Sequence, residues 1–163
     1  MKERQIIALI KEYRPDELPS QYLDLVDAAK SATQRAHAPY SKFHVGAAIR
    51  LENGEIVCGA NQENAAFSSG TCAERSAGFY AASRFPGVPF KQIAIAAGPE
   101  KATSSGFSVS FQKKPISPCG SCRQALLEYE AMYGDIEVIL YGDDAVYVLP
   151  SIKSLLPLCF TEF

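Results

Sequence analysis

The chain has 163 residues, of which 47% are hydrophobic and 21% charged, and its formal net charge is −2. These values are typical of a single soluble globular domain. Proteins that bind nucleic acids rely on clustered lysines and arginines, whereas the 16 basic residues here are spread along the sequence. The composition therefore argues against a nucleic-acid partner.

The first apolar run of the chain, residues 6–10, is followed directly by Lys11 and Glu12. This run is shorter than a secretory core of about 7–15 residues or a membrane span of about 20. We therefore expect a cytoplasmic protein with no membrane partner. In a reducing compartment the five cysteines are free for metal binding or catalysis.

The first half of the chain predicts a terminal appendage, a helix and a hairpin. Residues 1–19 are polar and charged, and we expect a helix-like appendage that ends at Pro15 and Pro19. Ser20 is a candidate N-cap for a helix whose apolar positions recur at helical spacing and which ends at Pro39. Two strands, residues 43–51 and 56–61, flank the Asn53-Gly54 turn.

The second half predicts helices alternating with strands. A Ser/Gly-rich loop leads into a helix over residues 72–84, and residues 93–97 predict a buried strand. Residues 99–118 predict a loop, and a second helix begins at Cys119 and runs to about residue 133. Strands over 136–141 and 145–149 and a short helix over 152–155 follow. This order predicts a mixed sheet covered by helices.

Two cysteine motifs indicate a metal site. Cys72 lies two residues before Glu74, and Cys119 and Cys122 form a Cys-x-x-Cys directly after Pro118. Zinc binds thiolates about 2.3 Å away in a tetrahedron, and catalytic zinc keeps its fourth position open for water. We therefore predict one Zn²⁺ held by the three cysteines, with Glu74 placed to exchange protons with the water.

Other interpretations of these cysteines stay open at this point. A lone Cys-x-x-Cys also occurs as a redox pair or as half of a structural zinc site. A structural site would need a fourth ligand from Cys58, Cys159, His37 or His44, none of which has suggestive spacing. We expect Cys58 and Cys159 to be small buried hydrophobic residues, and both histidines to be structural or solvated.

Three thiolates on one Zn²⁺ leave a net charge of −1, which weakens the pull of the metal on its water. Free aqueous zinc gives water a pKa of about 9, whereas catalysis needs a value near 7. Both cysteine-bearing segments are predicted to begin helices, and a helix N-terminus carries about half a positive charge. We expect the two helix dipoles to offset the sulfurs.

Zinc deaminases combine a Glu two residues after the first ligand with a later Pro-Cys-x-x-Cys, and a three-cysteine variant exists. Four segments of this chain, in order, closely resemble the small homotetrameric cytidine deaminases: residues 39–48, 61–65, 72–75 and 118–124. The resemblance extends over about residues 22–160. It implies a single-domain three-layer α/β/α sandwich with a mixed five-stranded sheet, a catalytic domain over residues 20–163, one Zn²⁺ per subunit and a homotetramer.

The resemblance implies hydrolysis of cytidine, and of 2′-deoxycytidine, to uridine or deoxyuridine plus ammonia, as in pyrimidine salvage. Our hypothesis is that water activated at the metal attacks C4 of the pyrimidine. Glu74 would take the proton of the water, deliver it to N3 and later protonate the departing amine. Arg75 resembles the arginine that hydrogen-bonds the zinc-bound sulfurs in this family.

Substrate contacts are also implied by the resemblance. Asn61 and Glu63, two residues apart and so on one face of a strand, would hold the 3′-hydroxyl of the ribose. Phe43 would lie beside the base with Val45 on the same face, and Ala73 is a further expected contact. Taken alone, the polar pair is also compatible with a solvated edge strand, and the two apolar residues with ordinary core positions.

Two further aromatic residues are candidate contacts across a subunit interface. Phe67 occupies the place of a tyrosine in many relatives, and phenylalanine cannot make the hydrogen bond of that hydroxyl. Phe160 resembles the C-terminal aromatic that stacks on the pyrimidine of an adjacent subunit, although a terminal apolar cluster is equally compatible with core closure.

Competing functions stay open on the sequence alone. A deaminase of another ring, such as blasticidin S or a purine, can share the zinc motifs, and the Asn61 and Glu63 pair favours cytidine. A non-catalytic zinc-binding module is opposed by the intact Glu74, and a nucleic-acid editing module by the mild acidity of the chain.

Overall fold

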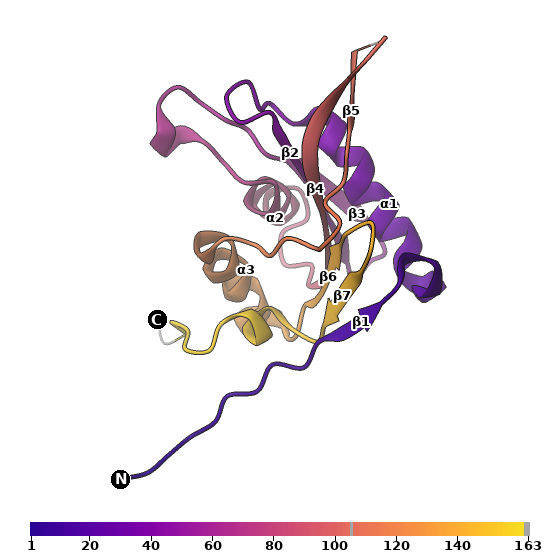
Figure 1. Ribbon diagram of the computed structural model, residues 1–163. Helices are drawn as coiled ribbons and strands as arrows, with labels where there is room; N and C mark the ends of the chain where they lie inside the picture. The colour runs from indigo at the N-terminus through magenta and orange to yellow at the C-terminus, as the bar shows by residue number, and fades with distance from the viewer. Residues whose placement is uncertain (105, 162–163) are drawn as a thin grey trace.

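The computed structural model describes residues 1–104 and 106–161. A mixed sheet lies at its centre, and helices cover both faces (Figure 1). The helices are α1 (Leu23–Ala32), α2 (Ala73–Arg84) and α3 (Gly120–Tyr133). The strands are β1 (Lys11–Tyr13), β2 (Phe43–Leu51), β3 (Ile56–Ala60), β4 (Phe90–Thr103), β5 (Gly106–Val109), β6 (Glu137–Tyr141) and β7 (Val146–Leu149). Short 3₁₀ turns occupy Pro15–Glu17, Ser20–Tyr22, Thr33–Arg35, Phe67–Ser69 and Ile152–Leu155.

The strands of the sheet lie in the order β1-β7-β6-β4-β2-β3, and β5 pairs with the outer half of β4. β4 and β6 are parallel, and α3 connects them, because a parallel pair needs a crossover of a dozen or more residues. The other pairs of the described chain are antiparallel. The predicted mixed α/β sheet with helices packed on it is therefore confirmed.

Each face of the sheet carries its own buried cluster. On one face, α1 packs Leu25, Val26 and Ala29 against β2, β3 and β4. On the other face, α2 and α3 pack an alanine- and leucine-rich surface against the same strands. The predicted three-layer arrangement follows, with the layer of α2 and α3 carrying the cysteine motifs (Figure 1).

Two glycines allow the helices to approach the sheet closely. A Cβ on Gly46 would lie 2.1 Å from the carbonyl oxygen of Ala29 in α1. A Cβ on Gly59 in β3 would lie 2.4 Å from the backbone nitrogen of Ala77 in α2. Since real Cβ atoms do not approach backbone this closely, only glycine permits this packing, which fixes the start of α2 against the sheet.

The five expected strands and the three main helices are all present, and two further strands extend the sheet to seven. The expected helix-like appendage is wrong for residues 11–13, which form β1 on the edge of β7. The expected N-cap at Ser20 is also wrong. Ser20 lies in a 3₁₀ turn that precedes α1, and its side chain makes no capping hydrogen bond to the helix. The expected loop over 99–118 contains instead the end of β4 and all of β5.

The β4–β5 hairpin is held in place by contacts that the hydrophobic pattern of the sequence does not reveal. Most of its side chains are exposed, so it lacks the alternation of a half-buried strand. It is tied to the core through Glu100, which forms an ion pair with Lys42 at 3.8 Å and lies 3.2 Å from the Nε2 atom of buried His44. The ring of Phe107 lies 4.5 Å from that of His44.

Among the described residues, none of the helices has both the length and the apolar character needed to cross a bilayer.

Candidate metal centre and substrate pocket

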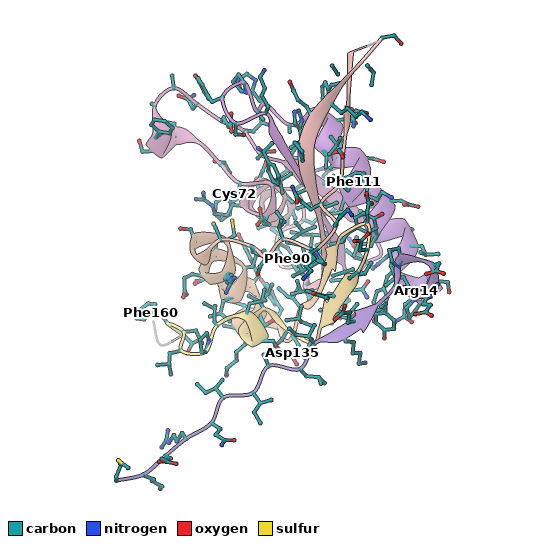
Figure 2. All side chains as sticks on the ribbon, viewed as in Figure 1. Arg14, Cys72, Phe90, Phe111, Asp135 and Phe160 are labelled. Carbon is teal, nitrogen blue, oxygen red and sulfur yellow. The ribbon has the colours of Figure 1, made fainter. Side chains whose placement is uncertain are left out.

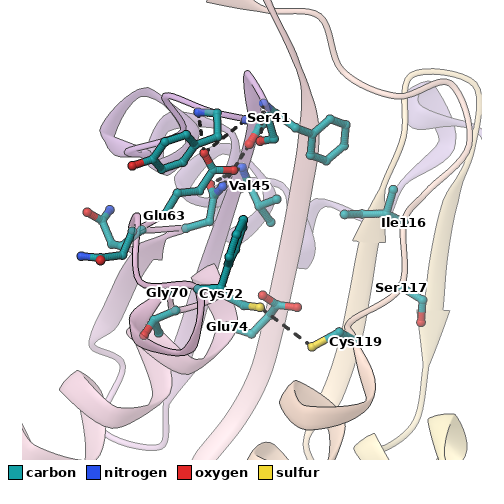
Figure 3. A pocket seen from close by; sticks show the side chains of 16 residues that line it. Ser41, Val45, Glu63, Gly70, Cys72, Glu74, Ile116, Ser117 and Cys119 are labelled. Atoms are coloured by element: carbon teal, nitrogen blue, oxygen red, sulfur yellow. Dashed lines mark hydrogen bonds between the residues drawn. The ribbon is translucent and has the colours of Figure 1, made fainter.

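The N-termini of α2 and α3 bring the three predicted cysteine ligands together. Cys72 is the N-cap of α2, Cys119 is the N-cap of α3, and Cys122 lies in the first turn of α3. Their sulfur atoms all lie within 4.8 Å of one another. The Sγ atoms of Cys72 and Cys119 are 3.9 Å apart (Figure 3). Those of Cys119 and Cys122 are 3.4 Å apart.

These separations fit a tetrahedral zinc ion. Four ligands about 2.3 Å from Zn²⁺ lie about 3.8 Å from one another, and the two sulfur distances lie on either side of this value. In the described part of the chain, no further His, Cys, Asp or Glu donor joins the group. The donor set is therefore three soft sulfurs, with no protein ligand at the fourth corner.

Positive charge reaches the sulfurs from two sources. Both helices point their N-terminal N–H groups toward the cluster, as expected from the sequence. The Nη2 atom of Arg75 lies 3.9 Å from the Cys72 sulfur, and its buried Nε has no hydrogen-bond partner among residues 1–104 and 106–161. Hydrogen bonds from Cys122, Arg75 and Cys119 lower the pKa of Cys72 to about 5, so a thiolate is favoured before any metal binds.

Glu74 lies on the first turn of α2 and is 4% exposed. Its carboxylate faces the pocket between the side chains of Cys72 and Cys119 (Figure 3). Burial raises the pKa of Glu74, and the negative charge of Cys72 raises it further. A carboxylate with a raised pKa can accept and return a proton near neutral pH, which is the property of a general acid–base group.

Cys72, Cys119 and Glu74 form the floor of a cavity of about 710 Å³, with Cys122 buried next to them. This volume lies within the range of small-molecule sites, about 300–1,000 Å³. Four segments supply the walls: the start of β2, the chain after β3, the turn before α2, and the loop before α3. The lining residues are Tyr40, Ser41, Phe43, Val45, Asn61, Gln62, Glu63, Asn64, Phe67, Gly70, Thr71, Cys72, Glu74, Ile116, Ser117 and Cys119 (Figure 3).

The end of the pocket away from the sulfurs is polar. The Oε2 atom of Glu63 accepts hydrogen bonds from the backbone nitrogens of Tyr40 at 2.9 Å and Ser41 at 3.2 Å. A hydrogen bond from the Ser41 side chain, followed by that from the Tyr40 backbone, lowers the pKa of Glu63. Because both backbone bonds end on Oε2, the other carboxylate oxygen can accept from a ligand hydroxyl.

Asn61 continues the sheet with its side chain. Its Oδ1 accepts from the backbone nitrogen of Val45 at 2.8 Å, and its Nδ2 donates to the carbonyl oxygen of Phe43 at 3.0 Å. The amide thus holds the start of β2, where Phe43 and Val45 both face the pocket. The intervening His44 faces the opposite side, where it is buried against Thr33 and Glu100 in a structural role.

Two of the predicted substrate contacts, Ala73 and Phe160, lie outside the cavity of the single chain, and a third, Phe67, lies at its edge. Phe67 lines the mouth and is 92% exposed. Ala73, the first residue of α2, is fully buried in the core, and Phe160 is exposed at the C-terminal end, where its carbonyl oxygen accepts from Gln124 at 2.8 Å. Cys58 and Cys159 are half-buried and pack against the two cores, and His37 is exposed.

Several residues of the site were not predicted from the sequence. Ser41 and the backbone of Tyr40 hold Glu63, and Ile116 and Ser117 form the wall next to Cys119. Arg123 braces this wall by donating to the Pro118 and Leu155 carbonyl oxygens at 2.8 and 2.7 Å, and to the Ser117 hydroxyl at 2.9 Å. Proximity to the Pro-Cys-x-x-Cys motif was the available signal for Ile116, Ser117 and Arg123, and the position of Tyr40 and Ser41 within segment 39–48 was the signal for those two residues.

Comparison with known proteins agrees with this geometry. Residues 19–134 match the family model described as the cytidine and deoxycytidylate deaminase zinc-binding region. The cytidine deaminase of Sporosarcina psychrophila is 38% identical over 139 residues, which cover 85% of this chain and 90% of the relative. That of Halalkalibacterium halodurans is 35% identical over 137 residues, covering 84% and 92%.

Solved structures give the same result. The crystal structure of cytidine deaminase from Burkholderia pseudomallei superimposes with a TM-score of 0.68 at 35% identity, covering 88% of this chain and all of that one. The Mycobacterium tuberculosis cytidine deaminase gives a TM-score of 0.64 at 29% identity, covering 87% and 98%. The three-cysteine cluster is thus the core of a zinc-binding region, and the chain belongs to the cytidine and deoxycytidylate deaminase family.

Proposed function

We propose that this protein is a hydrolase that converts cytidine and 2′-deoxycytidine to uridine and deoxyuridine with release of ammonia, as a step of pyrimidine salvage. One observation carries the proposal: a cluster of three sulfurs with zinc spacing lies beside a buried carboxylate at the floor of a nucleoside-sized cavity, which Cys72, Cys119 and Glu74 line. The relatives with matching sequences are cytidine deaminases, which supports the same substrate here.

The sulfurs of Cys72, Cys119 and Cys122 would hold one Zn²⁺ per subunit, and Arg75 would balance their charge. When bound, Zn²⁺ supplies a Lewis acid that brings the pKa of a water molecule toward 7. Glu74 holds the proton that the water loses as its oxygen adds to C4 of the pyrimidine, and passes that proton to N3. Glu74 then moves the proton of the new C4 hydroxyl to the amine, which leaves as ammonia.

The opposite end of the cavity would bind the sugar. Glu63 is kept ionised by its hydrogen bonds to the segment before β2, and its carboxylate accepts a hydrogen bond from the 3′-hydroxyl of the sugar. Asn61 contributes its remaining donor and acceptor capacity to the same hydroxyl. Phe43 and Val45 supply an apolar wall for the base. The catalytic domain would span residues 20–163, with residues 1–19 outside it.

We also propose a homotetramer in which neighbouring subunits complete each site. Phe67 at the cavity mouth and Phe160 at the C-terminal end are exposed in the single chain, as are Phe79 and Tyr80 on α2. Large exposed aromatic residues beside a binding cavity favour burial by another subunit. Phe67 and Phe160 would then contact substrate across an interface, and Ala73 would contact it through the backbone at the start of α2. Sedimentation of the purified protein tests this assembly.

The experiment that tests the function measures zinc and product on one preparation. We expect ammonia release with free cytidine and deoxycytidine, and none with single-stranded oligonucleotides. Blasticidin S or a purine nucleoside as a better substrate would contradict the assignment to cytidine. Glu74→Ala should keep its zinc and lose turnover by about 10²–10⁴-fold; an active Glu74→Ala variant would remove the proposed mechanism.

A further inference from the structure

The first ten residues, the N-terminal arm, extend away from the rest of the protein (Figures 1 and 2). All ten are exposed, and four of the five residues from 6 to 10 are large and aliphatic: Ile6 at 61%, Ile7 at 84%, Leu9 at 61% and Ile10 at 49% exposure. Within the described residues, no hydrogen bond or ion pair involves the arm. Its own chain therefore covers neither its backbone nor its apolar side chains.

The arm continues directly into an unpaired edge of the sheet. β1 pairs with β7 along one side, Lys11 facing Val148 and Tyr13 facing Val146, and in the described part of the chain no strand lies on its other side. An exposed edge with apolar side chains is a template for pairing with another strand. Residues 3–13 thus offer one long extended segment for such a partner.

We propose that the partner is the same segment of a second copy of this chain, paired antiparallel about a two-fold axis at Ala8. This register is self-complementary. It places Ile6 opposite Ile10 of the second copy, and Ile7 opposite Leu9. It places Arg4 opposite Glu12, which joins the arm of one copy to β1 of the other. Apolar and opposite-charge pairs across antiparallel strands each contribute about 0.2–1 kcal/mol.

Neighbouring registers lose this match. With the axis displaced by half a residue toward the N-terminus, Arg4 would face Lys11 and Glu3 would face Glu12, which are like-charge pairs. With the axis displaced by half a residue the other way, Ile6 would face Lys11. An axis at Ile7 would place Arg4 opposite Ile10. Ala8 is therefore the centre that satisfies both the charges and the aliphatic side chains.

The arm pairing is separate from the catalytic site. The arm lies outside residues 19–134, which match the family model, and contributes no residue to the cavity. It would extend the seven-stranded sheet from one copy into the next, with residues 3–5 of each copy lying along the free edge of β1 in the other. The pairing thus joins copies through the edge of the sheet, whichever other surfaces they share.

Disulfide formation tests both the contact and its register. Residues directly opposite in an antiparallel pair have Cα atoms about 4.5–5.5 Å apart, which suits a disulfide. We expect zinc-loaded Ala8→Cys protein, with Cys58→Ala and Cys159→Ala to remove other thiols, to form a covalent dimer in oxidised glutathione. The control is Ser31→Cys, at an exposed position on α1. At about 10 μM protein, the Ala8→Cys dimer should form at least about tenfold faster than the control dimer, because paired arms hold the two thiols at an effective concentration in the millimolar range.

The register has its own controls. Ile7→Cys alone should give little covalent dimer, whereas Ile7→Cys chains mixed with Leu9→Cys chains should cross-link. An Ala8→Cys rate equal to that of Ser31→Cys would overturn the pairing, and faster cross-linking of Ile7→Cys than of Ala8→Cys would overturn the register.

A charge swap supplies a second readout. Arg4→Glu places like charges opposite each other and should slow Ala8→Cys cross-linking by about tenfold, and Arg4→Glu combined with Glu12→Arg should restore it. A double variant no better than Arg4→Glu would contradict the pairing. Deaminase activity should stay unchanged in all these variants, so failure of the arm pairing is distinguishable from failure of the proposed function.

Discussion

The two ends of the cavity are built in different ways. At the metal end, three sulfurs and Glu74 lie at the N-termini of α2 and α3, whose inner faces are fully buried. At the polar end, which we propose binds the sugar, Glu63 and the segment before β2 are held by hydrogen bonds between side chains and backbone near the surface. The proposed reactive groups therefore lie on packed helices, and the proposed recognition groups lie on irregular segments, as in many enzymes.

This difference implies that the two ends fail differently when altered. A change at the metal end should remove the metal and the reaction together. A change at the sugar end should weaken substrate binding and leave the zinc in place.

The largest effect is expected for Cys119→Ser. The Cys119 side chain is exposed, so the fold should persist, but the site loses a sulfur ligand. We expect zinc content to fall well below one ion per chain and turnover to fall by roughly 10³-fold or more. Elemental analysis and a uridine assay on one sample measure both. Cys58→Ala is the matched control. Normal activity in zinc-depleted Cys119→Ser would contradict the expectation that a change at the metal end removes the metal and the reaction together.

A smaller effect, confined to the sugar end, is expected for Glu63→Gln. The amide replaces a charged acceptor that receives two backbone hydrogen bonds, and hydrogen bonds to charged groups are worth about 1.5–3 kcal/mol. We expect KM for cytidine to rise by about 10–100-fold with zinc unchanged. Glu128→Gln, the same change at an exposed position of α3 outside the cavity, is the control. Loss of zinc in Glu63→Gln would show that the two ends are coupled.

A stability effect at the metal end is expected for Gly59→Ala. The added Cβ would meet the backbone of Ala77 and Ala73 at 2.4 and 2.6 Å, so α2 must shift. We expect a loss of about 1–3 kcal/mol in the free energy of unfolding and weaker zinc binding, since Cys72 caps α2. In Gly78→Ala, on α2 itself, the nearest contacts are side chains at 3.5 Å or more, and stability should rise by about 0.5–1 kcal/mol. Urea unfolding of both variants distinguishes them.

The smallest effect is a pH dependence of substrate binding. The pKa of Glu63 is lowered by its hydrogen bonds with Ser41 and Tyr40, so its carboxylate stays ionised to lower pH than an ordinary glutamate. As pH falls, KM should therefore hold until the pH passes below the usual pKa of about 4.3 for glutamate. Binding of a product analogue, followed by calorimetry from neutral to acidic pH, measures this. Ser41→Ala should move the loss of binding to higher pH.

The helices, the central strands and the metal ligands could be predicted because their signals are local. Cys72 and Cys119 precede helical segments, and Asn53-Gly54 marks a hairpin whatever packs on it. β1 could not be predicted, because its three residues become a strand only by pairing with β7, more than 130 positions away. The β4–β5 hairpin was missed for a related reason, since its exposed residues carry no apolar alternation.

The sequence predicted that Asn61 and Glu63 share a site but not how the structure holds them. Asn61 and Glu63 were expected to share one face, and both do line the cavity. The sequence carried no sign that the Asn61 amide would bond the backbone of β2, or that Glu63 would accept from residues 40 and 41. Such contacts between side chain and backbone depend on how distant segments meet, which periodicity does not record.

X-ray absorption at the zinc edge tests the account most directly, because it counts the atoms around the metal in the resting protein. We predict three sulfurs at about 2.3 Å and one oxygen at about 2.0 Å, with that oxygen exchanging when a substrate analogue binds. A shell of four protein ligands, or of fewer than three sulfurs, would contradict a catalytic centre built by Cys72, Cys119 and Cys122.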